Sequence, residues 1–175
     1  MGRVVLGNIL AVVRTPTPGA ELDAIAALER SSYAPDEAAS PAVLAQRLAV
    51  APELFLAAYE ADNTQALLGF VCATRSSEQL TEESMRGHDP DGPLVCIHSV
   101  VVRDGARRRG VASALVREYL CRLPAKTPVA LIARAHHVSL YEKVGFVSQG
   151  PSPVVHGAGK WMEMQMETAG PARTD

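Results

Sequence analysis

The stretch from Val95 to Leu120 constrains the fold of this chain more than any other, because its periodicity changes midway. Its first part, Val95 to Val102, is a β-branched run with a single histidine, bounded by proline and glycine, as is typical of a buried strand. From Val111 to Leu123 the apolar residues recur at helical spacing instead. A buried strand therefore runs almost directly into a helix.

The junction between strand and helix reads Arg107-Arg108-Arg109-Gly110-Val111-Ala112. The first amides of a helix have no internal partner and lie at the positive end of its dipole. Small residues at Gly110 and Ala112 let a ligand approach that backbone, and arginines offer forked donors to phosphate oxygens. The junction therefore predicts an anion site, although a solvated basic turn before an ordinary helix has the same composition.

The composition limits the class of protein. At 175 residues with a formal net charge of −2, we expect one domain over residues 1–167 and no nucleic-acid partner. The cysteines show no paired spacing, so neither a disulfide framework nor a metal site is indicated. No apolar run approaches membrane-spanning length, so we expect a cytoplasmic protein with no membrane contact. We also expect a monomer or weak dimer. Residues 168–175 are expected to form a disordered tail.

The rest of the pattern supplies the other elements of the fold. We expect further strands at Asn8 to Arg14, Leu54 to Glu60, Leu67 to Thr74, Val129 to Ala133, Phe146-Val147 and Trp161 to Met166. We expect further helices at Ala20 to Ser32 and at Val138 to Val144, and a possible short one at Thr81 to Arg86. Another helix should begin at Pro41, with Ser40 as its N-cap. This order predicts an α/β (α+β) fold, with a mixed sheet of about seven strands and helices on both faces.

The junction also resembles a family signature. Arg108-Arg109-Gly110-Val111-Ala112, which can be read from Arg107 as well, is similar to the Gln/Arg-x-x-Gly-x-Gly/Ala signature of the GNAT superfamily of acetyl-CoA-dependent N-acetyltransferases. Five more segments resemble, in order, segments of serotonin (arylalkylamine) N-acetyltransferases, particularly those outside vertebrates: Ala51-Pro-Glu-Leu-Phe-Leu, Gln79-Leu-Thr-Glu-Glu-Ser-Met, the His98 strand, Leu140-Tyr-Glu-Lys-Val-Gly-Phe and Gly150-Pro-Ser-Pro-Val-Val. The resemblance spans nearly the whole chain, from Arg14 to Met166.

The resemblance implies a fold and a cosubstrate. In a GNAT domain two adjacent parallel strands, here Val95 to Val102 and Val129 to Ala133, splay apart around the pantetheine of acetyl-CoA. The coenzyme's amides would pair with the strand backbone, and its diphosphate would lie on the junction. The implied acetyl-CoA-binding residues are Val100, Val101, Val102, Arg107, Arg108, Arg109, Gly110, Val111, Ala112 and Ser113.

His98 is the candidate base on the strand. An alkylamine must lose a proton before it attacks a thioester, and an imidazole with an ordinary pKa near ~6.5 can accept it at neutral pH. Without the resemblance, a core histidine bonded to a backbone carbonyl would explain it as well. In vertebrate relatives this strand carries a His-x-His pair, but here Cys96 stands first. His98 would act alone through water or with His136, His137 or Glu163.

Cys96 and Tyr141 complete the predicted centre. Cys96 shares a face of the strand with His98, and we expect a small buried hydrophobe near the substrate rather than a nucleophile. Tyr141 corresponds to the family tyrosine near the thioester sulfur, where a phenol can give its proton to the departing thiolate. A packed aromatic on a short helix is the alternative for Tyr141, and Gly145-Phe146 behind that helix favours the family assignment.

The acceptor side is less constrained. By position, the family's mobile first loop corresponds to Ser31 to Pro41. Apolar residues for the wall of an aromatic pocket would be Tyr33, Pro35, Phe55 and Val154, whereas Asp36 and Glu37 could attract a cationic amine. The two acidic residues could equally be ordinary loop residues, and Phe55 could belong to the core.

Taken with the resemblance, these residues imply an enzyme that transfers the acetyl group of acetyl-CoA to the primary amine of a small arylalkylamine or polyamine by direct attack in a ternary complex. Two alternatives are open. A protein N-terminal or lysine acetyltransferase could use the polar segment Ser76 to Gly92 for docking. A non-catalytic acyl-CoA-binding domain would not need His98 and Tyr141 at their positions.

Overall fold

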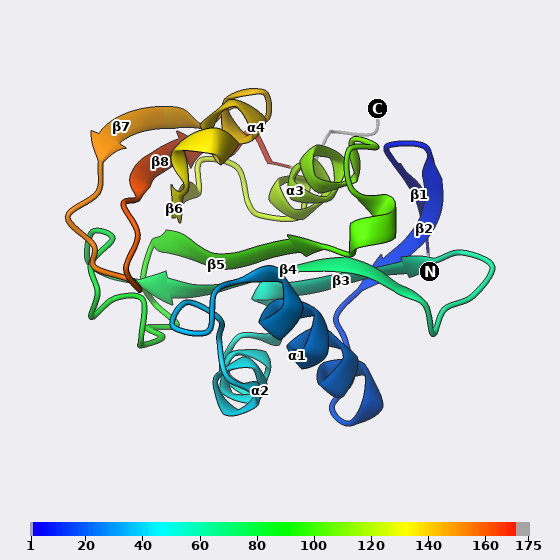
Figure 1. The fold of residues 1–175 in the computed structure, drawn as a ribbon. Helices are drawn as coiled ribbons and strands as arrows, with labels where there is room; N and C mark the ends of the chain where they lie inside the picture. Colours follow the sequence, from blue (N-terminus) through cyan, green and yellow to red (C-terminus); the bar gives the residue numbers. More distant parts are fainter. Residues whose placement is uncertain (1, 171–175) are drawn as a thin grey trace. The chain divides into compact units, whose positions relative to one another are not determined.

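Eight strands and four α-helices make up the computed structural model, which describes residues 2–170 (Figure 1). The strands are β1 (Arg3–Leu6), β2 (Ile9–Arg14), β3 (Phe55–Glu60), β4 (Leu67–Ser76), β5 (Leu94–Val102), β6 (Pro128–Ala133), β7 (Val147–Pro151) and β8 (Met162–Glu167). The helices are α1 (Ala20–Ser32), α2 (Pro41–Val50), α3 (Val111–Cys121) and α4 (Val138–Glu142). Within residues 2–170, no helix has both the length and the apolar character needed to cross a membrane.

The sheet confirms the expected fold class and adds one strand. Its order is β1-β2-β3-β4-β5-β6-β8-β7, with β5 and β6 parallel. The additional strand is β1, which the sequence did not reveal because four residues give too little alternation to stand out. Residues 82–86 form turns instead of the possible short helix at Thr81 to Arg86. The side-chain oxygens of Thr81 and Ser84 each accept a hydrogen bond from the other residue's backbone amide, which competes with helix formation.

Contacts divide the described chain into two compact units. Unit 1 comprises the described residues of Met1–Ala73 and Ser99–Leu115, and unit 2 those of Thr74–His98 and Val116–Asp175. Strands β4 and β5 and helix α3 pass from one unit into the other.

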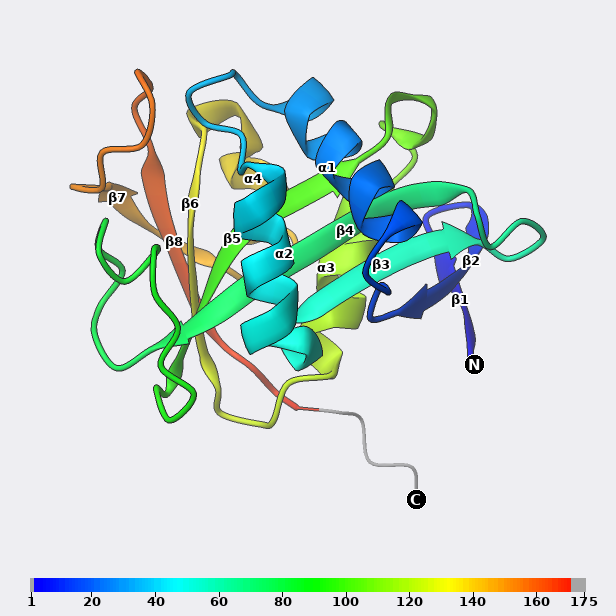
Figure 2. The same ribbon diagram turned by 90° about the horizontal axis from the view of Figure 1, so that it is seen from below.

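Unit 1 is built on an antiparallel meander with α1 and α2 against β3 and β4 (Figure 2). Helix α2 begins as expected, because the Ser40 hydroxyl accepts a hydrogen bond of 3.2 Å from the Val43 amide and Pro41 follows it. The buried cluster between helices and sheet consists of Ile25, Ala26, Leu44, Leu48, Phe55, Ala57, Tyr59, Phe70, Cys72 and Val101. Because Val101 of β5 belongs to this cluster, the cluster holds the C-terminal half of β5 in place just before the loop of residues 107–110.

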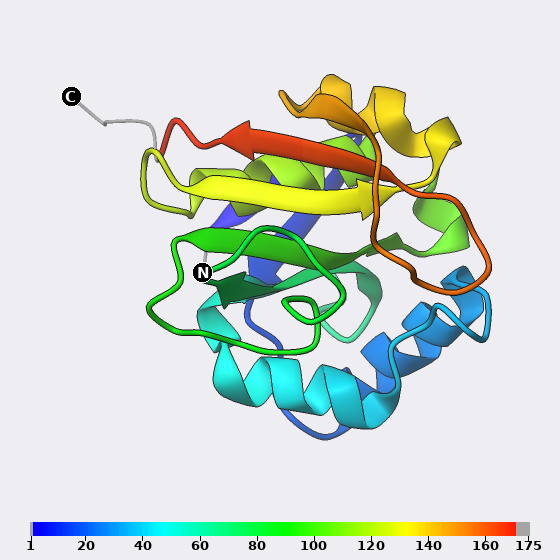
Figure 3. The ribbon, with the colours of Figure 1, turned by 90° about the vertical axis from the view of Figure 1, so that its left-hand side faces the viewer.

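Unit 2 contains the other half of β5 and the strands beyond it. β6 pairs with β8 along its whole length, and β8 also pairs with β7 (Figure 3). By contrast, β5 and β6 share only two residue pairs, Val95↔Val129 and Cys96↔Ala130, although β6 runs on to Ala133. The parallel pair therefore ends within the described part of unit 2 before His98 is reached.

The end of β8 is fixed more firmly than its composition suggested. Thr168, assigned from sequence to the tail, is 4% exposed, and its amide donates to the Thr127 carbonyl oxygen over 3.0 Å. The rest of the expected tail from residue 171 onward lies outside the described residues.

Candidate active site

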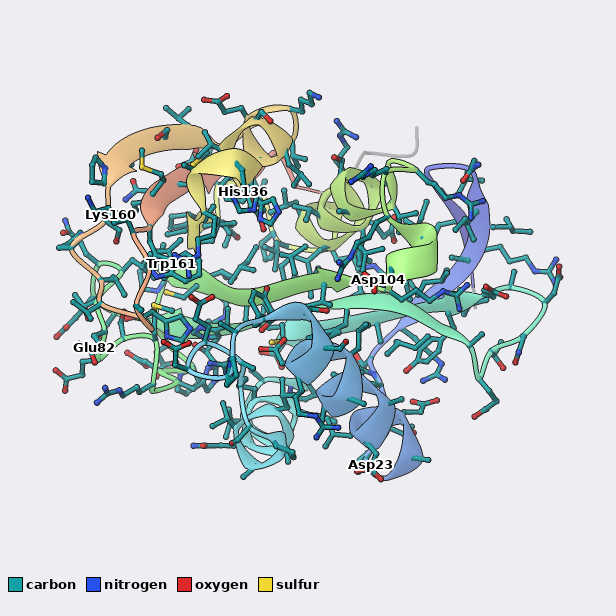
Figure 4. The ribbon with its side chains drawn as sticks, in the orientation of Figure 1. Asp23, Glu82, Asp104, His136, Lys160 and Trp161 are labelled. Atoms are coloured by element: carbon teal, nitrogen blue, oxygen red, sulfur yellow. The ribbon has the colours of Figure 1, made fainter. Side chains whose placement is uncertain are left out.

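The junction after β5 forms an exposed loop in unit 1. A 3-10 turn, Asp104–Ala106, carries the labelled Asp104 in Figure 4, and residues 107–110 are exposed before α3 starts at Val111. Arg108 and Gly110 have positive φ angles of 57° and 75°. Only glycine adopts such angles without strain, so the loop holds an unusual backbone shape at the start of the helix.

The three arginines of this loop have different surroundings. Arg107 donates from Nε to the Val102 carbonyl oxygen over 2.9 Å, pairs with Asp104 at 2.6 Å, and donates to the Ser32 hydroxyl over 3.2 Å. Arg109 donates from Nε to Oδ1 of Asn8 over 2.8 Å. Arg108 makes no side-chain hydrogen bond or ion pair with another residue of the described chain. Arg108 is therefore the arginine whose guanidinium is available to an incoming anion.

The backbone of β5 in unit 1 has two different edges. The Arg103 amide donates to the Leu68 carbonyl oxygen of β4 over 2.9 Å, and the Val101 carbonyl lies so close to Gly69 that a Cβ there would come within 2.3 Å. Because successive residues of a strand face opposite edges, Val100 and Val102 turn their polar groups away from β4. They are the residues of this strand whose backbone can pair with a ligand.

The edge at Val100 and Val102 already carries side-chain contacts. The Tyr33 hydroxyl lies 3.3 Å from the Val100 carbonyl oxygen and 3.4 Å from its amide nitrogen, and Arg107 occupies the Val102 carbonyl. These tyrosine contacts are long for hydrogen bonds, so they are weak. A ligand that pairs with this edge would replace the contacts of Tyr33 and Arg107 with its own hydrogen bonds.

A buried carboxyl group supports the loop between α1 and α2. Glu29 of α1 is 1% exposed; its Oε1 accepts from the Ala39 amide over 2.9 Å and from the Ser99 hydroxyl over 3.2 Å. Its Oε2 has no hydrogen-bond partner among the described residues. Burial raises the pKa of Glu29 above its ordinary value. Glu29 thus ties the loop before α2 to β5, one residue after His98.

The imidazole of His98 is held from β4 in unit 2. Oγ1 of Thr74, itself 3% exposed, lies 2.7 Å from Nε2 of the half-buried His98 ring. The hydroxyl can either donate to this nitrogen or accept from it, which fixes the ring's orientation in both tautomers. Sequence reasoning missed Thr74, because its pairing with His98 depends on the register of β4 against β5.

Cys96 lies in an apolar cluster of unit 2 with Leu80, Ala130 and Val154. It is fully buried, and burial, followed by the nearby Glu163 carboxylate, raises the pKa of its thiol to about 12. A thiol with that pKa is neutral at physiological pH and is not a nucleophile. Val154, 6% exposed, packs beside it.

Tyr141 belongs to the short helix α4 of unit 2. Its ring meets Phe146 edge-on with centroids 5.7 Å apart, because the chain reverses at Gly145, whose φ is 113°. The side chain is largely buried, and burial raises the pKa of its phenol. Tyr141 therefore keeps its proton, as a donor must.

The other candidates for the proton path also belong to unit 2. His136 and His137 are exposed on the turn before α4, with ring centroids 4.1 Å apart, and His136 is labelled in Figure 4. Glu163 of β8 accepts a hydrogen bond from Gln165 over 2.6 Å. The described residues contain no group of three or more His, Cys, Asp or Glu placed to hold a metal ion.

The predicted acceptor residues separate into core and loop. Phe55 is 1% exposed and packs on Phe70 with centroids 5.8 Å apart, so it lies in the core of unit 1, the alternative that the sequence left open. Pro35 and Asp36 are exposed on the loop, and Tyr33 is half-buried. Among the residues of unit 1 predicted to contact the acceptor amine, those of the loop are open to solvent, whereas Phe55 is buried.

The geometry defines an α/β domain in which two parallel strands pair over only two residue pairs and the first of them leads, through an arginine-rich loop, to the start of a helix. The profile of the acetyltransferase (GNAT) domain matches residues 25–168, and the chain therefore belongs to the GNAT acetyltransferase family.

Three known proteins show how far the likeness extends. Over 121 residues the chain is 33% identical to the serotonin N-acetyltransferase of Mesocricetus auratus, covering 67% of this chain and 58% of that protein, so it spans less than two thirds of this relative. The loading GNATL domain of CurA from Lyngbya majuscula superposes with a TM-score of 0.74 at 12% identity, covering 90% and 97% of the two chains. The phosphinothricin acetyltransferase of Sinorhizobium meliloti in complex with AcCoA gives 0.63 at 18% identity, covering 91% and 89%.

Proposed function

We propose that this protein transfers the acetyl group of acetyl-CoA to the primary amine of a small arylalkylamine, such as tryptamine, serotonin or phenethylamine, by direct attack in a ternary complex. The observation that carries the proposal is the imidazole of His98, held by Thr74 at the point where the pairing of β5 with β6 has ended. The likeness to a serotonin N-acetyltransferase supports this class of amine.

The residues of unit 1 fit the coenzyme. Acetyl-CoA supplies an acyl group already activated on sulfur. The amides of Gly110 to Ser113 are without helical partners at the positive end of α3, and Arg108 adds a guanidinium with no partner in the described chain. Such an arrangement suits a diphosphate. The backbone edge at Val100 and Val102 can pair with the amide groups of the coenzyme once Tyr33 and Arg107 give up their hydrogen bonds to it.

His98 takes the proton of the amine. The Thr74 hydroxyl fixes the orientation of the ring at Nε2, and the Nδ1 atom of the same ring is buried. A fixed ring lowers the entropy lost when amine and base meet. Cys96 does not take a proton, because its thiol pKa of about 12 keeps it neutral and protonated.

Tyr141 returns a proton to the departing sulfur. Burial raises the pKa of its phenol, so it holds its proton until a stronger base appears. A thiolate formed in the same dry surroundings is also made more basic by desolvation. A direct transfer with separate acid and base requires no acetylated side chain, which agrees with a neutral Cys96.

A thiol-release assay with acetyl-CoA tests the proposal. Its acceptors are tryptamine, serotonin, phenethylamine, spermidine and short peptides. We expect turnover with the arylalkylamines. Preference for spermidine would assign a polyamine acetyltransferase, and preference for peptides would assign a protein acetyltransferase. Binding of acetyl-CoA without transfer to any amine would leave a non-catalytic acyl-CoA-binding domain and overturn the proposal.

A further inference from the structure

The tip of the β1–β2 hairpin lies against the arginine-rich loop of residues 107–110 within unit 1 (Figure 1). The hairpin spans residues 3–14, which precede the region that matches the GNAT profile, residues 25–168. Leu6 pairs with Ile9, so Gly7 and Asn8 form a two-residue turn. Gly7 has a φ of 63°, as the first position of a II′ hairpin turn requires.

Gly7 touches the loop through its backbone. A Cβ at this position would lie 1.9 Å from the Arg109 carbonyl oxygen and 2.9 Å from the carbonyl carbon. In the other direction, a Cβ on Gly110 would lie 3.6 Å from the Gly7 Cα. Only glycine permits this approach, and its positive φ demands glycine for a second reason.

Asn8 adds a directional contact at the same place. Its Oδ1 accepts a hydrogen bond of 2.8 Å from Nε of Arg109. Arg109 stands between Arg108 and Gly110, whose positive φ angles define the shape of the loop. A non-glycine residue in that region is strained by about 1 kcal/mol or more, and such a conformation persists where surrounding contacts hold it.

We propose that Gly7 and Asn8 are positioning residues that hold residues 107–110 in the shape that binds the coenzyme's diphosphate. The inference rests on the proposed function, because it assigns the diphosphate to this loop. Without the hairpin tip, the loop samples other backbone shapes, and the apparent affinity for coenzyme A falls by the fraction of time spent in them.

Calorimetric titration of coenzyme A into the full-length protein tests this. We expect Asn8→Ala to weaken coenzyme A binding by about three- to fivefold, the worth of one exposed hydrogen bond to a charged group. At high ionic strength, where salt screens the repulsion between the new carboxylate and the diphosphate, Asn8→Asp should bind coenzyme A more tightly than Asn8→Ala, because a carboxylate also accepts from Arg109. Gly7→Ala should weaken binding further. At saturating acetyl-CoA, kcat and the KM for the amine should stay unchanged in the Asn8 variants.

Asn63 provides the matched control. It lies in the turn between β3 and β4 of the same unit, where its Oδ1 accepts from the Gln65 amide over 3.2 Å. Asn63→Ala should bind coenzyme A like the wild type. The inference alone fails if Asn8→Ala binds as tightly as the wild type, or if Asn8→Asp is weakened as much as Asn8→Ala at high ionic strength. If the wild-type protein does not bind coenzyme A, the proposed function fails, and the inference fails with it. The comparison of Asn8→Ala with Asn8→Asp tests the inference even if Gly7→Ala does not fold.

Discussion

The two units stabilise their important groups in different ways. In unit 1 three arginines form ion pairs: Arg14 with Glu21, Arg103 with Glu60, and Arg107 with Asp104. In unit 2 the groups assigned to chemistry are neutral at physiological pH or can become so. His98 is bonded to a hydroxyl, Tyr141 packs on a phenyl ring, and Cys96 lies among apolar residues.

This difference follows from what each unit is proposed to do. Binding a highly charged coenzyme calls for fixed backbone amides and cations. In the loop of unit 1, contacts with Asp104 and Asn8 hold Arg107 and Arg109, while Arg108 is left for the anion. Proton transfer needs groups whose protonation is set by burial, and in unit 2 burial raises the pKa values of Cys96 and Tyr141. Substitutions in both units test that division, beginning with the largest expected effect.

Replacing Tyr141 by Phe should have the largest effect. The ring keeps its edge contact with Phe146, and only the buried hydroxyl is lost. If Tyr141 is the proton donor, kcat should fall by about 10²-fold or more, as for other general acids, with coenzyme A affinity unchanged. Steady-state kinetics and calorimetry measure the two quantities. The control is Tyr59→Phe, the same change at a buried tyrosine of unit 1, which should leave kcat as it is. A normal kcat in Tyr141→Phe would remove the phenol from the mechanism.

Glu29 is a buried carboxyl group of unit 1 whose hydrogen bonds come from neutral donors. Glu29→Ala removes the acceptor of two hydrogen bonds and should lower the free energy of unfolding by about 1–3 kcal/mol. Glu29→Gln keeps an oxygen acceptor and removes the ionisation. Because burial raises the pKa of Glu29, the folded state binds its proton more tightly than the unfolded state.

The sign of the pH effect on Glu29 follows from this. The wild type is favoured below the ordinary pKa of a glutamate and loses stability as pH rises from there to the raised pKa, whereas Glu29→Gln loses none by this route. Denaturant unfolding between pH 4 and 8 should therefore show the wild type falling relative to Glu29→Gln. A constant difference across that range would show that the carboxyl group does not titrate there.

Thr74→Val should give a smaller loss in unit 2. Valine has nearly the same shape and leaves Nε2 of His98 without its 2.7 Å partner. We expect kcat/KM to fall by about tenfold, which corresponds to ~1.4 kcal/mol of lost orientation, and Thr74→Ser to retain most of the activity. Thr127→Val is the matched control, since it deletes a hydroxyl bonded to the Pro124 carbonyl in the same unit. Equal losses in both variants would indicate a general effect of destabilisation.

Sequence reasoning found the elements of this molecule better than it found the contacts between them. The run from β5 through Arg107–Gly110 to α3, the cap at Ser40 and the turn at Gly145 are local features, so spacing and residue type were enough to predict them. The fold class followed from their order. The short strand β1 was missed because its partner strand, not its own pattern, defines it.

The site residues that were missed depend on register and tertiary packing. Thr74 meets His98 only through the alignment of β4 with β5, and Glu29 reaches Ser99 across 70 positions of sequence. A glutamate on the inner side of an otherwise apolar helix face was the one available signal for Glu29. The three arginines looked alike in the sequence, and their contacts with Asn8, Asp104 and Val102 distinguish them.

The acid stability of unit 1 offers the smallest expected effect. Glu21 accepts from Arg14 and from the amide and hydroxyl of Thr17, at 2.7 and 2.9 Å for the latter two. The bond from Arg14 is the main cause that lowers the pKa of Glu21 to about 2. A lowered pKa stabilises the folded state above the ordinary pKa, 4.5, and this contribution is lost as pH falls through 2. Because the pair is partly open to water, we expect a loss of about 1–2 kcal/mol. Denaturant unfolding of the wild type and Glu21→Gln should converge as pH falls from 5 to 2. Parallel curves would mean that the Arg14 pair contributes no net stability, and that the paired charges of unit 1 serve orientation alone.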